Sequence, residues 1–131
     1  MEEQPIVLIV EDDEDLQSLA KDALSEGGYQ PAIAASAEEA LMLLQSGQIK
    51  YRALVLDISL RGRMNGWEAA RKARQIDPNF PIVYMTAGAG DEWPSQGVPD
   101  SVLLQKPFAL AQLVTAVSQL LNNGASIAGR K

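Results

Sequence analysis

Short apolar runs recur along the chain, and each is followed by polar or turn-forming residues. Within a run, apolar and polar residues do not alternate, so both faces of the predicted strand are expected to be buried. The second run is the weakest of the set. The predicted strands cover residues 6–10, 30–35, 53–56, 82–85 and 102–105.

Helical spacing of apolar residues follows most of these runs. Glycines or a proline close the helical stretches, and Ser36 with Glu39 forms a capping-box pattern at the start of one of them. The predicted helices lie between residues 16 and 27, 36 and 47, and 67 and 76, and over residues 109–121.

The segment 87–100 departs from this pattern. Three glycines and two prolines fall within it, so at most one short helical turn is predicted, around residues 91–95.

Alternating strands and helices predict an α/β fold with a parallel sheet covered on both faces. Five such strands usually adopt the flavodoxin-like order 2-1-3-4-5, a three-layer sandwich whose ligand crevice lies at the carboxyl ends of the strands. Here the fourth helix is expected to be short or missing. We expect one domain over residues 1–131, with a core of about 6–121 and a frayed tail over 122–131.

Composition narrows the possible chemistry. The chain has no cysteine and no histidine, which excludes disulfides, thiolate metal sites and a histidine phosphocarrier. Its net charge of −6 argues against nucleic-acid binding. No apolar run approaches the roughly 20 residues of a membrane span, and the N-terminus lacks a basic signal region, so no membrane association and a cytoplasmic location are expected.

Polar side chains stand where the predicted strands end. Glu11 and Asp12 follow the first strand, and Asp57 ends the third. Thr86 follows the fourth strand, and Lys106 follows the fifth. The carboxyl ends of parallel strands share one edge, so three carboxylates would crowd a single crevice. They can remain ionised together only around a cation, and oxygen ligands favour Mg²⁺.

Such a crevice suits phosphoryl transfer. An aspartate carboxylate is a known nucleophile toward phosphorus, which makes Asp57 the candidate acceptor. Mg²⁺, the Lys106 ammonium and the Thr86 hydroxyl could each neutralise an oxygen of the transferring group.

Each of these residues has a simpler reading when it is taken alone. Asp12 or Asp13 could be only a helix N-cap, and Asp57 could begin a turn. Thr86 could be a loop hydroxyl and Lys106 a solvated charge. The functional hypothesis depends on the joint pattern, in which every group stands at the correct strand end.

Four stretches of the sequence resemble the response-regulator receiver family of two-component signalling, in its chemotaxis-regulator-like form. They are VLIVEDDEDL, ALVLDISLRGRMNGWEAARKAR, PIVYMTA and LLQKPF. The resemblance extends from Ile6 to about Leu121, nearly the whole chain. It implies a bacterial phosphoprotein that catalyses only its own phosphorylation and dephosphorylation.

By this resemblance Asp57 is the phosphoacceptor. Glu11 and Asp12 match the acidic pair that binds Mg²⁺ together with Asp57, and Asp12 is the more direct ligand. Ser59 stands where the family offers a main-chain carbonyl to the metal.

Thr86 matches the family's switch hydroxyl, and Lys106 its active-site lysine. The bond between Lys106 and Pro107 is expected to be cis. The expected partners are a histidine kinase or a histidine phosphotransfer protein, and a downstream protein that the sequence does not identify. The chain itself is expected to be a monomer or a weak dimer.

Two features depart from the family pattern. Leu103 stands where receivers usually carry the Tyr or Phe that switches with the threonine. The segment 87–100 replaces a full fourth helix and carries Trp93, which either covers the edge of the sheet or anchors a partner.

Arg61 and Arg63 flank the candidate site and could attract a phosphohistidine donor, whereas the basic residues at 71–74 are expected to form a solvated helix face.

Three functions compete at this point. The first is a signalling receiver without its own output domain, acting alone, in a relay or as part of a larger kinase. The second is a magnesium-dependent phosphatase, which would want an acid two residues after the nucleophile, where Ser59 stands. The third is an interaction module that is not phosphorylated, which the complete set of polar groups argues against.

Overall fold

The computed structural model describes residues 4–88 and 90–129. Its centre is one sheet of five parallel strands in the order β2-β1-β3-β4-β5, as the sequence predicts. The strands are β1 (Ile6–Val10), β2 (Gln30–Ala34), β3 (Tyr51–Asp57), β4 (Ile82–Thr86) and β5 (Val102–Gln105).

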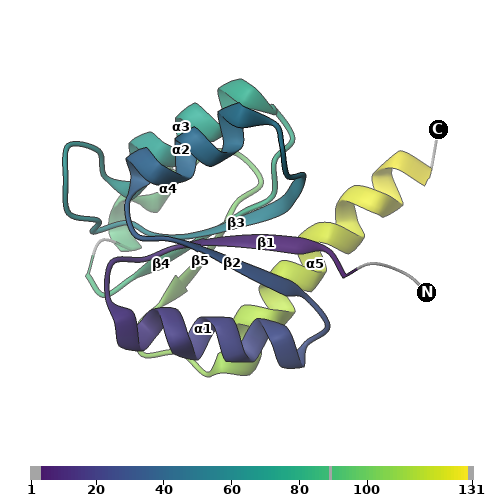
Figure 1. Ribbon diagram of the computed structural model, residues 1–131, viewed down its shortest axis with the longest axis horizontal. Helices are drawn as coiled ribbons and strands as arrows, with labels where there is room; N and C mark the ends of the chain where they lie inside the picture. Colours follow the sequence, from purple (N-terminus) through teal and green to yellow (C-terminus); the bar gives the residue numbers. More distant parts are fainter. Residues whose placement is uncertain (1–3, 89, 130–131) are drawn as a thin grey trace.

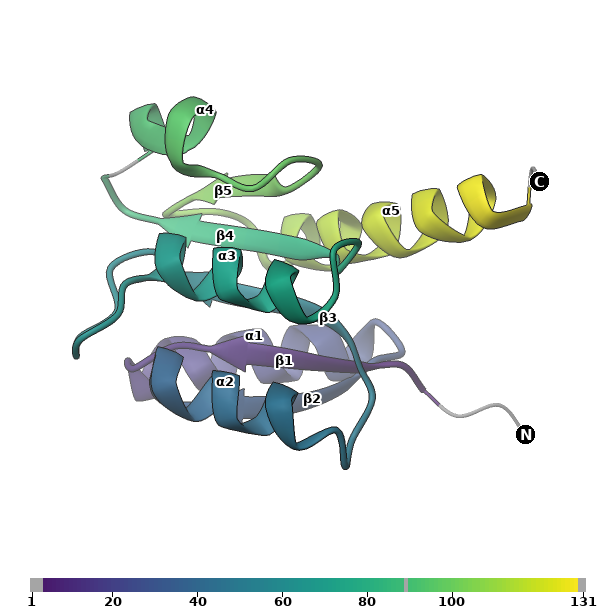
Figure 2. The same cartoon turned by 90° about the horizontal axis from the view of Figure 1, so that it is seen from above.

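Helices cover both faces of this sheet, which gives the molecule three layers (Figure 1, Figure 2). One face carries α1 (Glu14–Glu26) and α5 (Leu110–Gly129). The other carries α2 (Ala37–Ser46), α3 (Gly66–Ile76) and α4 (Trp93–Gln96).

The sheet is buried on both faces. In β1, Val7 and Ile9 belong to the core under α1 and α5, whereas Leu8 and Val10 belong to the core under α2 and α3. All four side chains are 0% exposed. This explains why the strands read as continuous apolar runs in the sequence.

Capping side chains fix where helices begin after the strands. Asp13 is the N-cap of α1, and its carboxylate accepts hydrogen bonds from two main-chain N–H groups of the first turn. Ser36 caps α2 by accepting from the N–H of Glu39 at 3.1 Å, as its motif predicts. Asp13 is therefore the capping residue, which leaves Glu11 and Asp12 available at the end of β1.

The connection between β4 and β5 contains a 3₁₀ turn and the four-residue α4, so the predicted short fourth helix is confirmed. Trp93 is partly buried against the core and donates from Nε1 to the Ser101 hydroxyl at 3.0 Å. The Tyr84 hydroxyl accepts from the N–H of Val98 at 3.1 Å. Trp93 thus covers the side of the sheet at its outer strand β5, which is the first of its two predicted roles.

The structure differs from the sequence prediction at the end of α5. The tail expected to fray covers residues 122–131; residues 122–129 continue the helix, and 130–131 lie outside the described residues. Helix α5 projects beyond the sheet (Figure 2). Extending a helix that already exists adds a hydrogen bond per residue without a new nucleation cost. No helix in the described part of the chain has the length and apolar character to cross a bilayer.

Candidate functional site

Three carboxylates meet at the carboxyl ends of β1 and β3. These strands are direct neighbours, with Val10 paired to Leu56, so the residues that follow them lie side by side. Glu11, Asp12 and Asp57 each bring a carboxylate oxygen within 4.8 Å of the others. The structure thus brings together the acids that the sequence places at one sheet edge.

Glu11 is buried at this edge, with only 1% of its surface exposed. Its Oε2 accepts a hydrogen bond from the N–H of Asp13 at 3.0 Å, whereas its buried Oε1 has no hydrogen-bond partner among the described residues. Burial raises the pKa of Glu11 to about 7, and the nearby charge of Asp57 acts in the same direction. The hydrogen bond from the Asp13 N–H and the charge of Lys106 lower this pKa and offset part of the rise.

Lys106 brings a positive charge to the cluster from the end of β5. Its Nζ lies 3.1 Å from Asp57 Oδ2 and 3.6 Å from Glu11 Oε1. Burial alone would lower the pKa of Lys106, but the hydrogen bond and charge of Asp57, together with Glu11, raise it above its usual value. The Lys106–Pro107 bond is cis, as expected.

Asp57 is held on two sides. Lys106 donates to its Oδ2, and the main-chain N–H of Ser59 donates to its Oδ1 at 2.9 Å. Behind it, Gly66 at the start of α3 packs so closely that a Cβ there would overlap the Asp57 carbonyl oxygen and lie 2.6 Å from Ile58 Cα. Asp57 therefore has a fixed position at the end of β3.

Thr86 lies on the next strand and is fully buried. Its Oγ1 accepts from the N–H of Gly88 at 3.2 Å, and its carbonyl accepts from the N–H of Lys106 at 2.7 Å. The ends of β3, β4 and β5 thus place Asp57, Thr86 and Lys106 along one edge.

The donor set fits a hard divalent cation. All three carboxylates offer oxygen, and one buried oxygen, Glu11 Oε1, lacks a hydrogen bond within the described chain. The three carboxylates exceed the positive charge beside them, which consists, among the described residues, of Lys106 and the exposed guanidinium of Arg61. Carboxylate oxygens with room for water are the ligands that Mg²⁺ favours.

The family model described as the response regulator receiver domain matches residues 7–118. The chain belongs to the response regulator receiver family. A solved receiver protein from Sinorhizobium medicae WSM419 is 43% identical to this receiver, with a TM-score of 0.88, and the alignment covers 92% of this chain and 96% of that one.

Curated relatives of the receiver differ in length. The response regulator receiver protein CpdR of Brucella abortus is 32% identical over 117 residues, which are 88% of this chain and 95% of CpdR. The transcriptional regulatory protein CusR of Escherichia coli K12 is 32% identical over 124 residues, which are 92% of this chain and 53% of CusR. The receiver therefore spans about half the length of CusR and nearly all of CpdR.

Leu103, which stands at the position of the usual aromatic, is partly buried in this receiver. It packs on the same core as Trp93, and its Cδ2 would lie 3.4 Å from a Cβ placed on Gly90. The amide nitrogen of the Gln105 side chain lies closer still to that Cβ position. The start of the β4–β5 connection thus packs directly on β5.

Sequence reasoning missed two groups of arginine contacts, one at the site and one between α3 and its neighbouring segments. Arg61 pairs with Asp12 across 49 positions of the chain, a contact that no local pattern signals. In α3, Arg71 donates to Gln96 of α4, and Arg74 donates to the carbonyl of Phe80. The face at residues 71–74 is therefore only partly solvated, because these two arginines bind neighbouring segments.

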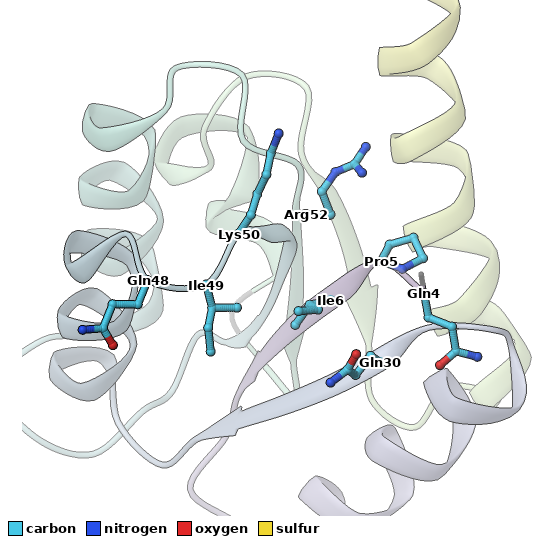
Figure 3. Close-up of a pocket in the computed structure, with 8 residues that line it drawn as sticks. All are labelled: Gln4, Pro5, Ile6, Gln30, Gln48, Ile49, Lys50 and Arg52. Atoms are coloured by element: carbon cyan, nitrogen blue, oxygen red, sulfur yellow. The ribbon is translucent and has the colours of Figure 1, made fainter. Parts of the chain in front are cut away.

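A hollow of about 780 Å³ lies at the other end of the receiver's sheet (Figure 3). Ile6 and Gln30, the first residues of β1 and β2, contribute to it, so it opens at the amino ends of the strands. The described residues that line it carry no carboxylate; they are Gln4, Pro5, Ile6, Gln30, Gln48, Ile49, Lys50 and Arg52. It is separate from the carboxylate cluster.

Proposed function

We propose that this receiver accepts a phosphoryl group on Asp57 from the phosphohistidine of a histidine kinase or a phosphotransfer protein, in a reaction that depends on Mg²⁺. The observation that carries the proposal is the cluster of Glu11, Asp12 and Asp57 with Lys106 bonded to Asp57. The donor histidine must lie outside these 131 residues, because they contain no histidine.

In the proposed step, a carboxylate oxygen of Asp57 attacks phosphorus and forms an acyl phosphate. The phosphorus–nitrogen bond of the donor breaks, and the released imidazole nitrogen takes up a proton. Ser59 N–H and Lys106 hold the carboxylate in place, and Lys106 also faces the negative charge of the incoming group.

Glu11, Asp12 and Asp57 would hold the cation, with the main-chain carbonyl of Ser59 as a further ligand. When bound, Mg²⁺ supplies positive charge to the phosphoryl oxygens in the transition state. Glu11 would act mainly by keeping negative charge beside the metal. Thr86 would donate its hydroxyl to a phosphoryl oxygen after transfer.

Phosphorylation adds about −1.5 to −2 charge beside the buried end of β4. The segment that follows Thr86 packs on β5, and we infer that its rearrangement changes the binding of a downstream protein. Two arrangements are compatible with the proposal: a receiver that acts separately, as the length of CpdR allows, and a receiver within a longer regulator or kinase, as the length of CusR allows. We infer a cytoplasmic location and a monomer or weak dimer.

The test is to incubate the protein with acetyl phosphate, with and without Mg²⁺, and to measure the intact mass. We expect one phosphoryl adduct that forms only with Mg²⁺ and is absent in Asp57→Asn. Asp22→Asn, on the exposed side of α1, is the matched control and should keep the adduct. An adduct that persists in Asp57→Asn would refute the site assignment.

A further inference from the structure

Arg61 makes an unusual contact with the candidate metal site. It lies on the loop between β3 and α3, and its main-chain N–H donates to Asp12 Oδ2 at 3.1 Å. Its guanidinium returns to the same oxygen, with Nε at 3.5 Å. Gly62, the next residue, has a φ of 113°, a conformation that glycine adopts freely and that turns the loop back at this point.

Asp12 thus has two competing uses. Its carboxylate belongs to the cluster that fits a divalent cation, yet Oδ2 already carries a positive partner. A second cation at this oxygen would meet the guanidinium at short range, and like charges there repel. The guanidinium must therefore move away for Asp12 to bind a metal with this oxygen.

The arginine can move at little cost. Its side chain is 88% exposed, so water replaces the ion pair readily and the pair itself contributes little to folding. Arg63 lies two positions further along the same loop and is also exposed. Among the ion pairs of the described residues, Arg63 has none. Arg61 and Arg63, which the sequence alone does not distinguish, therefore differ in their contacts with the carboxylate cluster.

We propose, as an inference that rests on the proposed function, that Arg61 competes with the divalent cation for Asp12 and so weakens the affinity of the receiver for Mg²⁺. Arg61 occupies Asp12 when no metal is bound. Mg²⁺ displaces the guanidinium, while the main-chain N–H of Arg61 continues to orient the carboxylate.

The size of the effect follows from its position. The guanidinium is close to Oδ2 but surrounded by water and salt, which screen its field. We expect that removing its charge tightens Mg²⁺ binding about fourfold. Removing the charge of Arg63 should change the affinity by less than about 1.5-fold, because its only influence is the screened field of a more distant charge.

The experiment titrates MgCl₂ into the unphosphorylated protein at constant ionic strength and follows ¹H–¹⁵N NMR signals. The main-chain amides of Ser59 and Arg61 report binding, because both donate to carboxylates of the cluster. The Nε–H signal of Arg61 reports the guanidinium itself. Arg61→Gln is compared with the matched variant Arg63→Gln.

Two results would support the proposal together. Arg61→Gln binds Mg²⁺ about fourfold more tightly than both the parent and Arg63→Gln. In the parent, the Nε–H signal of Arg61 moves along the same titration curve as the amide of Ser59, whereas that of Arg63 stays in place.

Two other results would overturn it. Equal Mg²⁺ affinity in the two variants, or weaker binding in Arg61→Gln, would refute the competition while leaving the proposed function intact. Failure of the parent protein to bind Mg²⁺ at all would refute the proposed function and this inference with it.

Discussion

Glu11 is the residue whose ionisation is tied most closely to the site. Its carboxyl is buried, and its pKa is raised to about 7 chiefly by that burial. Without a cation, a proton can relieve the crowding with Asp57. With a cation, the charged form becomes the favoured one, because metal ligands must be deprotonated. One side chain thus links proton binding, metal binding and stability.

This residue makes the stability of the metal-free protein depend on pH. The pKa of Glu11 in the folded state lies above its ordinary value of 4.5, so the folded state holds this proton more tightly than the unfolded state. The resulting stabilisation is fully present below about pH 4.5 and is lost as pH rises through about 7. It amounts to roughly 3 kcal/mol.

Urea unfolding in the presence of a chelator, at about pH 5 and about pH 8, measures this dependence. Glu11→Gln should lack this part of the pH dependence, since its amide does not titrate, and excess Mg²⁺ should restore stability to the parent at the higher pH. Identical pH profiles for the parent and Glu11→Gln would contradict the prediction.

At the scale of elements, the contact between α3 and β3 positions the phosphoacceptor. Gly66 is the first residue of α3 and packs on the main chain of Asp57 and Ile58. Gly66→Ala should cost roughly 1–3 kcal/mol, because the added methyl pushes against backbone that cannot rotate away. It should also slow phosphorylation by acetyl phosphate, since the end of β3 must shift.

Gly88→Ala is the control for this substitution, since, its chain neighbours aside, no atom of the described residues lies within 4 Å of a Cβ placed there. Thermal unfolding and the rate of adduct formation should both separate the two variants. A Gly66→Ala protein with the stability and rate of Gly88→Ala would show that the close packing does not fix Asp57.

The elements themselves were largely predictable from sequence, because buried parallel strands read as apolar runs and end in polar residues. The gathering of Glu11, Asp12 and Asp57 followed from strand order alone. The pairing of Arg61 with Asp12 was not predictable, since it depends on how a loop folds over a distant strand end. The assignment of Asp13 as the N-cap needed the backbone geometry as well.

At the scale of the whole molecule, the site is joined to the β4–β5 connection through Thr86. That connection is held by a few side-chain bonds, among them Tyr84 to Val98 and Trp93 to Ser101, rather than by a long helix. Because α4 has only four residues and much of the described connection is exposed, its amides should exchange rapidly in the unphosphorylated protein.

We predict that residues 90–101 exchange hydrogen more slowly when Asp57 carries a phosphoryl group or its beryllium fluoride mimic with Mg²⁺. The physical reason is that new bonds to Thr86 would order the segment that begins there. Hydrogen exchange followed by mass spectrometry measures this, with α2 as an internal reference. Equal protection in the two states would exclude a switching role for the segment.

The central claim is that the carboxyl ends of β1 and β3 hold a divalent cation beside the phosphoacceptor. The most direct measurement is a crystal structure of the protein soaked in Mn²⁺, with the metal located by its anomalous scattering. The account predicts one strong site bound by Asp12, Asp57 and the Ser59 carbonyl, with Glu11 beside it and the Arg61 guanidinium displaced. A metal bound elsewhere, with these carboxylates still paired only to Lys106 and Arg61, would contradict it.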